Sequence, residues 1–384
     1  MTFEEQMREW RHHFHAHPES AFEEVNTAEY VARALAAMGY EVHRNIGKTG
    51  LVGCLKLGGS PDMIGIRADM DCNQLTEQGD LPYRSQTPER MHACGHDGHT
   101  AMALGAAKLL AERRNFNGTA CFVFQPAEEP GYGARAMLKD GLLEKFPMRE
   151  IYGIHNWPGI KAGTFATRIG GIMASEDNFV IRITGVGAHA ARPHMAKDPL
   201  VIAAEIILAL QTIISRNLDP TLPAVISCTE LHTNGIRNAI PGMVEIKGDT
   251  RSFSPDVQIM LETRMRTVCE SLCAMNGAAC AFEYTHEFAP TVNHADCVAV
   301  AVAAAAAVAG ADRVDGNALP MMGSEDFGAF LEKIPGCYAF IGNGDASDSK
   351  GATPLHNSRY DFNDDILVPG AEFLAEIIRS RMPQ

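Results

Sequence analysis

The sequence predicts an α/β protein of two domains, in which a ferredoxin-like βαββαβ domain is inserted into an α/β/α domain with a mixed sheet. Its 384 residues are too many for one typical hydrophobic core. Short apolar runs alternate with helical patterns in both terminal parts of the chain, as in sheets covered by helices on both faces. Between residues 178 and 290 the pattern changes to the strand and helix order of a ferredoxin-like unit.

The first domain is expected to comprise residues 1–177 and 291–384. Hydrophobic periodicity and turn residues predict its helices at 3–17, 22–38, 100–113, 294–309 and 365–380, with a further segment at 324–333. Strands are expected at 51–57, 62–68, 119–125, 151–155, 164–169 and 337–341. The inserted domain, 178–290, should contain strands at 178–185, 222–231, 243–252 and 278–285, and helices at 198–216 and 256–275.

Composition excludes several classes of protein. The formal net charge is −14, and binding to nucleic acid requires a basic surface. The charged first ten residues do not resemble a signal peptide, and the apolar run 297–310 is shorter than the roughly 20 residues of a membrane span. The ten cysteines are scattered, so we expect a cytoplasmic protein with free thiols. Cys269 and Cys273 are interpreted as one buried helix face rather than a redox or metal pair.

The densest group of chemically active side chains lies at 91–100, just before a predicted helix. Cys94 and His96, separated by one glycine, can both reach a metal from a loop, and thiolate and imidazole suit zinc and neighbouring transition metals. Asp97 or Thr100 is placed to cap the helix. Taken alone, the group is also compatible with a capped, histidine-rich turn.

Further ligand-type residues follow other predicted strands. Glu128 and Glu129 come directly after the strand 119–125, where open α/β sheets place ligands, although a solvated acidic turn has the same pattern. His155 follows another apolar strand, and His356 precedes the final helix. Together with Cys94 and His96, three of these residues (Glu129, His155 and His356) make five donors, too many for one tetrahedral ion. Five donors suit two ions that share a bridging ligand.

Two aspartates could support these ligands. Asp69 and Asp71 follow the strand 62–68 at alternating positions, so their side chains point to one side. They could orient the ligating histidines through hydrogen bonds. A capping pair in a turn is the alternative.

The ordered motifs resemble the M20 metallopeptidase family, in the amidohydrolase branch that includes hippurate hydrolases, N-acyl-amino-acid deacetylases and auxin-conjugate hydrolases. The resemblance covers nearly the whole chain. Its motifs are the segments 15–19, 69–71, 94–99, 125–129, 153–156, 187–189, 238–241, 323–327 and 355–357.

The resemblance implies a role for each candidate. Cys94 would bridge two divalent ions (zinc, manganese, cobalt or nickel), His96 and His155 would complete one, and Glu129 and His356 the other. Glu128 would be the general base, which takes a proton from the attacking water and passes it to the leaving amine. Asp71 matches the family's metal-orienting aspartate, and Asp69 lies where other branches carry a ligating histidine.

The resemblance also implies contacts with the substrate. His189, in the inserted lid and dimerisation domain, would stabilise the oxyanion, often in the active site of the dimer partner. Asn238 and Arg251 would hold the substrate carboxylate, for which arginine is well shaped. Ser324 and Glu325 would belong to the rim of the substrate site.

The expected activity is hydrolysis of the amide bond of a small N-acyl or N-aroyl amino acid by a cytoplasmic homodimer, without a nucleic-acid or membrane partner. The alternatives are a dipeptidase or aminopeptidase, disfavoured because those branches typically bridge with aspartate, and a catalytically silent metal-dependent binding protein, disfavoured by Glu128.

Other patterns carry less weight. The histidine-rich segment 12–17 is not interpreted as a metal site, and the glycine-containing segment 185–190 lacks the helix that a dinucleotide site requires. The segment Cys72–Thr76 is more polar than in the family, so Asn73 and Gln74 are expected to alter the substrate pocket.

Overall fold

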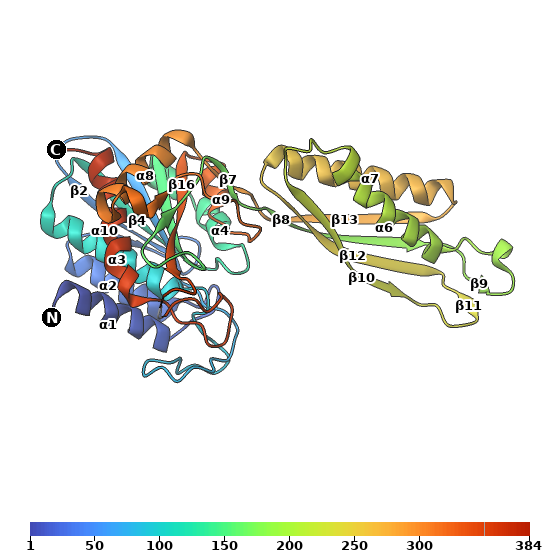
Figure 1. Ribbon diagram of the computed structural model, residues 1–384, viewed down its shortest axis with the longest axis horizontal. Helices are drawn as coiled ribbons and strands as arrows, with labels where there is room; N and C mark the ends of the chain where they lie inside the picture. The colour runs from blue at the N-terminus through green and yellow to red at the C-terminus, as the bar shows by residue number, and fades with distance from the viewer. Residues whose placement is uncertain (349) are drawn as a thin grey trace. The chain divides into compact units, whose positions relative to one another are not determined.

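The computed structural model describes residues 1–348 and 350–384, which form two compact units (Figure 1). The first unit contains Met1–Ile172, Val292–Pro320 and Asp326–Gln384, and the second contains Met173–Thr291 and Met321–Glu325. The expected domain limits, 178 and 290, lie within a few residues of the two main crossings. Residues 321–325 also belong to the second unit, whereas they were expected in the first domain.

The first unit contains most of the helices and the larger sheet. Its helices are α1 (Phe3–Ala16), α2 (Val25–Ala37), α3 (His96–Arg113), α4 (Gly133–Lys139), α5 (Leu142–Lys145), α8 (Ala295–Ala309), α9 (Gly328–Leu331) and α10 (Leu367–Arg381), with short 3-10 turns at Ala311–Arg313 and Asp364–Ile366. The strands of its sheet are β1 (Glu41–Arg44), β2 (Leu51–Leu57), β3 (Met63–Asp69), β4 (Gly118–Gln125), β5 (Glu150–Pro158), β6 (Phe165–Ala166), β15 (Val314–Asp315) and β16 (Gly336–Gly344). A separate pair joins β7 (Gly170–Met173) to β14 (Thr291–Asn293).

The larger sheet is mixed, with the strand order β1-β2-β4-β3-β5-β16-β6-β15. The central four strands, β4, β3, β5 and β16, are mutually parallel. Strands β1 and β2 pair antiparallel with their neighbours, whereas β6 pairs antiparallel with β16 and parallel with β15. The carboxyl ends of the four parallel strands therefore meet at one edge of the sheet, which is where α/β proteins place ligands.

The main apolar core lies between this sheet and the helices α1, α2, α3, α8 and α10. All eight residues of β4 are buried, as expected of a strand covered on both faces. Helix α3 is buried on nearly every side, because its alanines, glycines and leucines allow α1 and α10 to pack closely. This packing fixes the amino end of α3, which carries His96.

The second unit is a four-stranded antiparallel sheet with two helices. Its elements in chain order are β8 (Glu176–Thr184), β9 (Ala188–His189), α6 (Pro199–Arg216), β10 (Ala224–Thr233), β11 (Ala239–Ile240), β12 (Met243–Ser252), α7 (Pro255–Met275) and β13 (Ala279–Phe288), with a 3-10 turn at Pro193–Met195. The strand order β10-β12-β8-β13 is that of a ferredoxin-like fold, and β9 pairs with β11. The predicted fold class is thus confirmed. Cys269 and Cys273 are buried in this unit's core, as predicted.

Several local predictions were wrong. Helix α3 begins at His96 after Gly95 in a left-handed conformation, and no side chain caps it, so Asp97 and Thr100 lie inside the helix, in its first and second turns. The strand expected at 164–169 is reduced to Phe165–Ala166, and β1, α4 and the short strands were not predicted. Such short elements carry little periodic pattern of their own.

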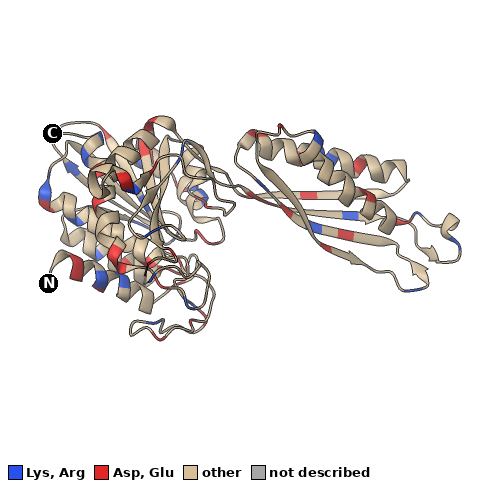
Figure 2. Cartoon of the chain, viewed as in Figure 1, with Lys and Arg blue, Asp and Glu red and all other residues tan. Residues whose placement is uncertain are grey.

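Charged residues of both signs are mixed along the chain, and one helix is strongly apolar. Figure 2 shows Lys and Arg interspersed with Asp and Glu along the helices and strands of both units. One helix of the described residues, α6, is long and apolar enough to cross a membrane by length and composition, and about one third of it is buried. It contributes Ile202, Ile206, Leu210 and Ile213 to the core of the second unit, so one such helix is weak evidence for a membrane span. All ten cysteines are free.

Candidate metal centre

The five candidate metal donors lie at one edge of the larger sheet. Cys94 and His96 stand at the start of α3, Glu129 follows β4, His155 lies near the end of β5, and His356 belongs to the loop after β16. Because these strands are parallel neighbours, residues separated by up to 262 positions, Cys94 to His356, come together.

The donor atoms form two groups of three that share Cys94. Cys94, His96 and His155 form one group, and Cys94, Glu129 and His356 form the other; within each group all ligand atoms lie within 4.8 Å of one another. Cys94 Sγ is 3.4 Å from His155 Nε2. Glu129 lies between two histidines, with Oε1 3.8 Å from His96 Nε2 and Oε2 3.5 Å from His356 Nε2.

The imidazole rings are oriented so that one nitrogen of each faces the centre. Nδ1 of His96 is 2.9 Å from the backbone oxygen of Asp71, and Nδ1 of His155 is 2.6 Å from that of Asn156. Hydrogen bonds of this kind fix the ring and leave Nε2 for a metal. Nε2 of His96 and Oε1 of Glu129 are buried and have no hydrogen-bond partner within the described chain. These two orphaned atoms, which face each other, fit a cation between them.

The electrostatics also favour a cation. Burial, followed by the charge of Glu129, raises the pKa of the Cys94 thiol well above its usual value. Burial likewise raises the pKa of Glu129 and lowers that of His155 well below its usual value. Burial opposes protonation of His96, but Asp69 and Asp71 outweigh it and raise the pKa of this ring. A divalent ion would stabilise the thiolate and carboxylate and would replace the proton on His96.

The two predicted aspartates have different contacts. The carboxylate of Asp71 accepts the backbone N–H groups of Glu128 (3.0 Å) and Glu129 (3.1 Å), and lies 3.3 Å from His96 Nδ1. Asp69 instead pairs with Arg67 (2.6 Å) and with His99 Nδ1 (2.6 Å). Asp71 therefore hydrogen-bonds candidate ligands directly, whereas the hydrogen bonds of Asp69 go to Arg67 and His99, and its Oδ2 lies 3.8 Å from His96 Nε2.

Glu128 lies beside the donors. It is 7% exposed, and its Oε2 lies 3.8 Å from His96 Nε2. With Glu129 and His96 it forms a further group whose ligand atoms lie within 4.8 Å of one another. A carboxylate in this position can reach a water molecule held between the donors.

The candidate substrate residues belong to the second unit and do not form one cluster there. His189 is exposed on β9, and its Nδ1 accepts the N–H of Ala191. Asn238 precedes β11, whereas Arg251 lies near the far end of β12. Arg251 pairs with Asp249 (2.8 Å) and Glu176 (3.0 Å) and donates to Ser324 Oγ (3.4 Å); Glu325 is buried.

Sequence reasoning missed several buried polar residues around the centre. His99 Nε2 lies 2.8 Å from the side-chain oxygen of Asn156. The side-chain nitrogen of Asn156 donates to the Tyr360 hydroxyl. Gln125 and Asp326 hold Arg67 from two other elements. His99, Gln125, Asn156 and Asp326 lie within the family motifs 94–99, 125–129, 153–156 and 323–327, which was the available signal, but residue type alone does not reveal their burial or their partners.

A buried ion pair involves Asp97, the residue next to the candidate ligand His96. His15 Nδ1 is 2.8 Å from Asp97 Oδ2, and both side chains are fully buried. Burial opposes protonation of His15, but hydrogen bonds with Asp97 and Glu77 raise its pKa to about 9. The segment 12–17 thus contributes structural contacts, and none of its histidines belongs to a metal-type group of the described residues.

This pair predicts a pH-dependent stability. Since His15 has a folded pKa above the unfolded value of about 6.5, its charge stabilises the fold fully below pH 6.5, and this stabilisation is lost as pH rises through about 9. We expect His15→Gln to lower the free energy of unfolding by on the order of 2 kcal/mol at pH 6 and by much less at pH 9.5. Urea unfolding at both pH values measures this, with the exposed His17→Gln as control. A difference that does not change with pH would contradict the assignment.

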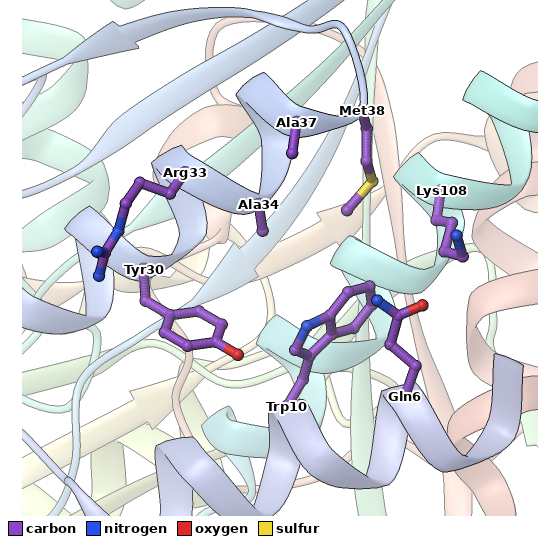
Figure 3. A pocket seen from close by; sticks show the side chains of 8 residues that line it. All are labelled: Gln6, Trp10, Tyr30, Arg33, Ala34, Ala37, Met38 and Lys108. Atoms are coloured by element: carbon purple, nitrogen blue, oxygen red, sulfur yellow. The ribbon is translucent and has the colours of Figure 1, made fainter. Parts of the chain in front are cut away.

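A separate groove opens in the helical layer of the first unit. It has a volume of about 520 Å³ and is lined by residues of α1, α2 and α3 and by Met38, which follows α2 (Figure 3): Gln6, Trp10, Tyr30, Arg33, Ala34, Ala37, Met38 and Lys108. None of the candidate donors lines it, so it is distinct from the metal centre.

Known proteins match both the sequence and the fold. The model of peptidase family M20/M25/M40 matches residues 65–380. The chain belongs to this family. It is 40% identical to the hippurate hydrolase of Campylobacter jejuni over 367 residues, 96% of this chain and 94% of the relative. It is 35% identical to an N-acetylcysteine deacetylase of Bacillus subtilis over 378 residues, 98% of this chain and 97% of the relative.

Among solved structures of the family, a Bacillus subtilis protein described as a dinuclear metal binding peptidase superposes with a TM-score of 0.86. It is 32% identical, and the match covers 99% of this chain and 98% of that one. The predicted family and the class of enzyme, a hydrolase acting on amides, are therefore confirmed. Divalent metals are supported.

Proposed function

We propose that this family member hydrolyses the amide bond of an N-acyl or N-aroyl amino acid at a two-metal centre, with Glu128 as general base. One observation carries the proposal: two three-donor groups share Cys94 and lie beside a carboxylate that belongs to neither. Cys94 would bridge, His96 and His155 would complete one ion, and Glu129 and His356 the other. Thiolate, imidazole and carboxylate donors suit zinc, manganese, cobalt or nickel.

Divalent ions in such a site polarise the amide carbonyl and make a bound water acidic near neutral pH. The side chains of this protein would transfer the proton, position the reacting groups and stabilise the oxyanion. Glu128 takes a proton from the water as the water attacks the amide carbon, and delivers that proton to the nitrogen of the departing amino acid. Asp71 holds the backbone of Glu128 and Glu129, so the base and the ligand keep their relative positions. His189 would stabilise the oxyanion, in its own or a partner's active site.

The substrate class rests on the names of the relatives. Both named relatives act on N-acylated amino acids, one with an aroyl and one with an acetyl group. Asn238, Arg251, Ser324 and Glu325 are proposed to contribute to the binding of the substrate. Arg251 is already paired with two carboxylates, so it would have to exchange one of them for the substrate. The polar segment at Asn73 and Gln74 is proposed to affect the choice of substrate.

One assay tests the activity. Metal-reconstituted protein is incubated with hippurate, a set of N-acetyl amino acids and a set of dipeptides, with and without a chelator, and release of the amino acid is measured. We expect hydrolysis of at least one acylated amino acid, at least 100-fold faster than of any dipeptide, and its loss on chelation. Preference for dipeptides would favour the peptidase alternative, and binding without turnover would favour a metal-dependent binding protein.

We also propose a cytoplasmic homodimer. The ten free cysteines support a reducing compartment. Strand β10 is an edge strand of the second unit's sheet, and α6 of the same unit exposes Leu200, Val201 and Leu208. An edge strand beside an exposed apolar helix face suits association with a second copy.

A further inference from the structure

Two buried carboxylates hold three consecutive backbone N–H groups in the turn that carries the proposed base. Asp71 accepts those of Glu128 and Glu129, as described above. Glu24 Oε1 accepts the third, the N–H of Ala127, at 2.8 Å. Glu24 is completely buried and lies 103 residues away from this turn in sequence. No motif pointed to it.

The turn is in a conformation that needs such support. Ala127 has a φ of +50°, in the left-handed region that alanine rarely adopts, and it directly precedes Glu128. Its carbonyl accepts the N–H groups of Tyr132 (3.2 Å) and Gly133 (2.9 Å). A Cβ at Gly133 would lie 1.6 Å from the carbonyl oxygen of Pro126, so only glycine fits there. The unfavourable backbone at Ala127 thus persists because contacts hold it on both sides.

Both the backbone and the side chain of Glu24 make hydrogen bonds that hold it in place. Its backbone lies at the amino end of α2, where its carbonyl accepts the N–H of Ala28 at 2.9 Å. Its second carboxylate oxygen accepts the hydroxyl of Thr49 at 2.5 Å. Both oxygens of the side chain are therefore used, one on the turn and one on the loop before β2.

This placement has an electrostatic cost. Burial, and then the neighbouring charge of Asp71, raise the pKa of Glu24 to about 7. The hydrogen bonds from Thr49 and Ala127 oppose this shift, because they favour the ionised form. The hydrogen bond to Ala127 joins Glu24 to the residue that sets the direction in which the chain enters Glu128.

We propose that Glu24 is a positioning residue, which fixes the left-handed Ala127 and thereby orients Glu128 toward the attacking water. The proposal rests on the proposed function of Glu128 as the base. An amide oxygen can accept the same N–H, and the Thr49 hydroxyl can turn to accept from an amide nitrogen. Glutamine at position 24 should therefore keep the function of Glu24, whereas alanine should lose it.

The test compares Glu24→Ala, Glu24→Gln and Glu19→Ala as metal-loaded enzymes. Glu19 is the matched control, because its carboxylate also holds the start of α2, through the N–H groups of Asn26 and Thr27, but does not contact the turn. We expect Glu24→Ala to lower kcat at least tenfold, with KM within threefold and two metals per chain. Glu24→Gln and Glu19→Ala should keep kcat within threefold.

Several outcomes would overturn the proposal. These are full kcat in Glu24→Ala, an equal loss in Glu19→Ala, a loss in Glu24→Gln as large as in Glu24→Ala, or loss of metal in step with kcat. If Glu24→Ala does not fold, Thr49→Val decides: we expect at least a threefold lower kcat, and an unchanged kcat overturns the proposal. Glu128→Gln is measured alongside, since an active Glu128→Gln enzyme refutes the proposed base itself, whatever Glu24 does.

Discussion

Glu128→Gln is expected to lower kcat by about 10³-fold, within the range for the loss of a general base. Glutamine has the shape of glutamate but cannot accept the proton of the attacking water. The Asp71 carboxylate holds residue 128 through its backbone N–H, so the substitution leaves the turn in place. The proposed ligand set does not include Glu128, and both ions should stay bound.

Steady-state hydrolysis of the best acylated amino acid, with metal content measured on the same sample, checks this prediction. The matched control is Glu77→Gln, a carboxylate that contacts His15 and the N–H of Ser85 rather than the donors. Residual activity above about a tenth of the original, with both metals present, would remove Glu128 from the mechanism.

Cys94→Ala is expected to abolish activity and to lower metal content from two ions to fewer than one per chain. Cys94 is the one residue common to both three-donor groups of the proposed centre, and alanine offers neither ion a donor. Each ion would then be left with two protein ligands, fewer than the three that catalytic sites usually use. Zinc bound in proteins also prefers a thiolate, so water in place of Sγ is a poor substitute.

Metal analysis after dialysis, together with the hydrolysis assay, measures the effect. Cys337→Ala is the control, because it removes another fully buried thiol that lies on β16 and belongs to no donor group of the described residues. Loss of only one ion from Cys94→Ala would show that Cys94 is a terminal ligand and not a bridge.

Much of this protein could be predicted from local sequence. The apolar runs of β2, β3 and β4 and the periodic patterns of α6 and α7 are strong because each element buries a continuous face. The candidate ligands could be listed because they stand at strand ends or before a helix, where open α/β sheets place ligands, and because the ordered motifs around them resemble those of one family. Short strands such as β6 and β15 could not be predicted, because two residues are too few to show the alternation of buried and exposed side chains.

The start of α3 also shows that local sequence patterns do not predict contacts between distant residues. Asp97 has the residue type and place of a cap, but Gly95 begins the helix, and the carboxylate turns to His15. That contact links residues 82 positions apart, and no local rule predicts it.

The sequence by itself determined the fold class, the family and the identity of the candidate donors, because these depend on residue type, periodicity and order along the chain. The family resemblance implied how the donors are grouped around Cys94, and the donor atoms lie close together in the same two groups. Only the tertiary structure decided which imidazole nitrogen faces the centre and that Glu24 holds the turn at Ala127. These features depend on backbone direction at single residues and on contacts across the sheet. Buried polar partners are selected by distance and hydrogen-bond geometry, neither of which residue type specifies.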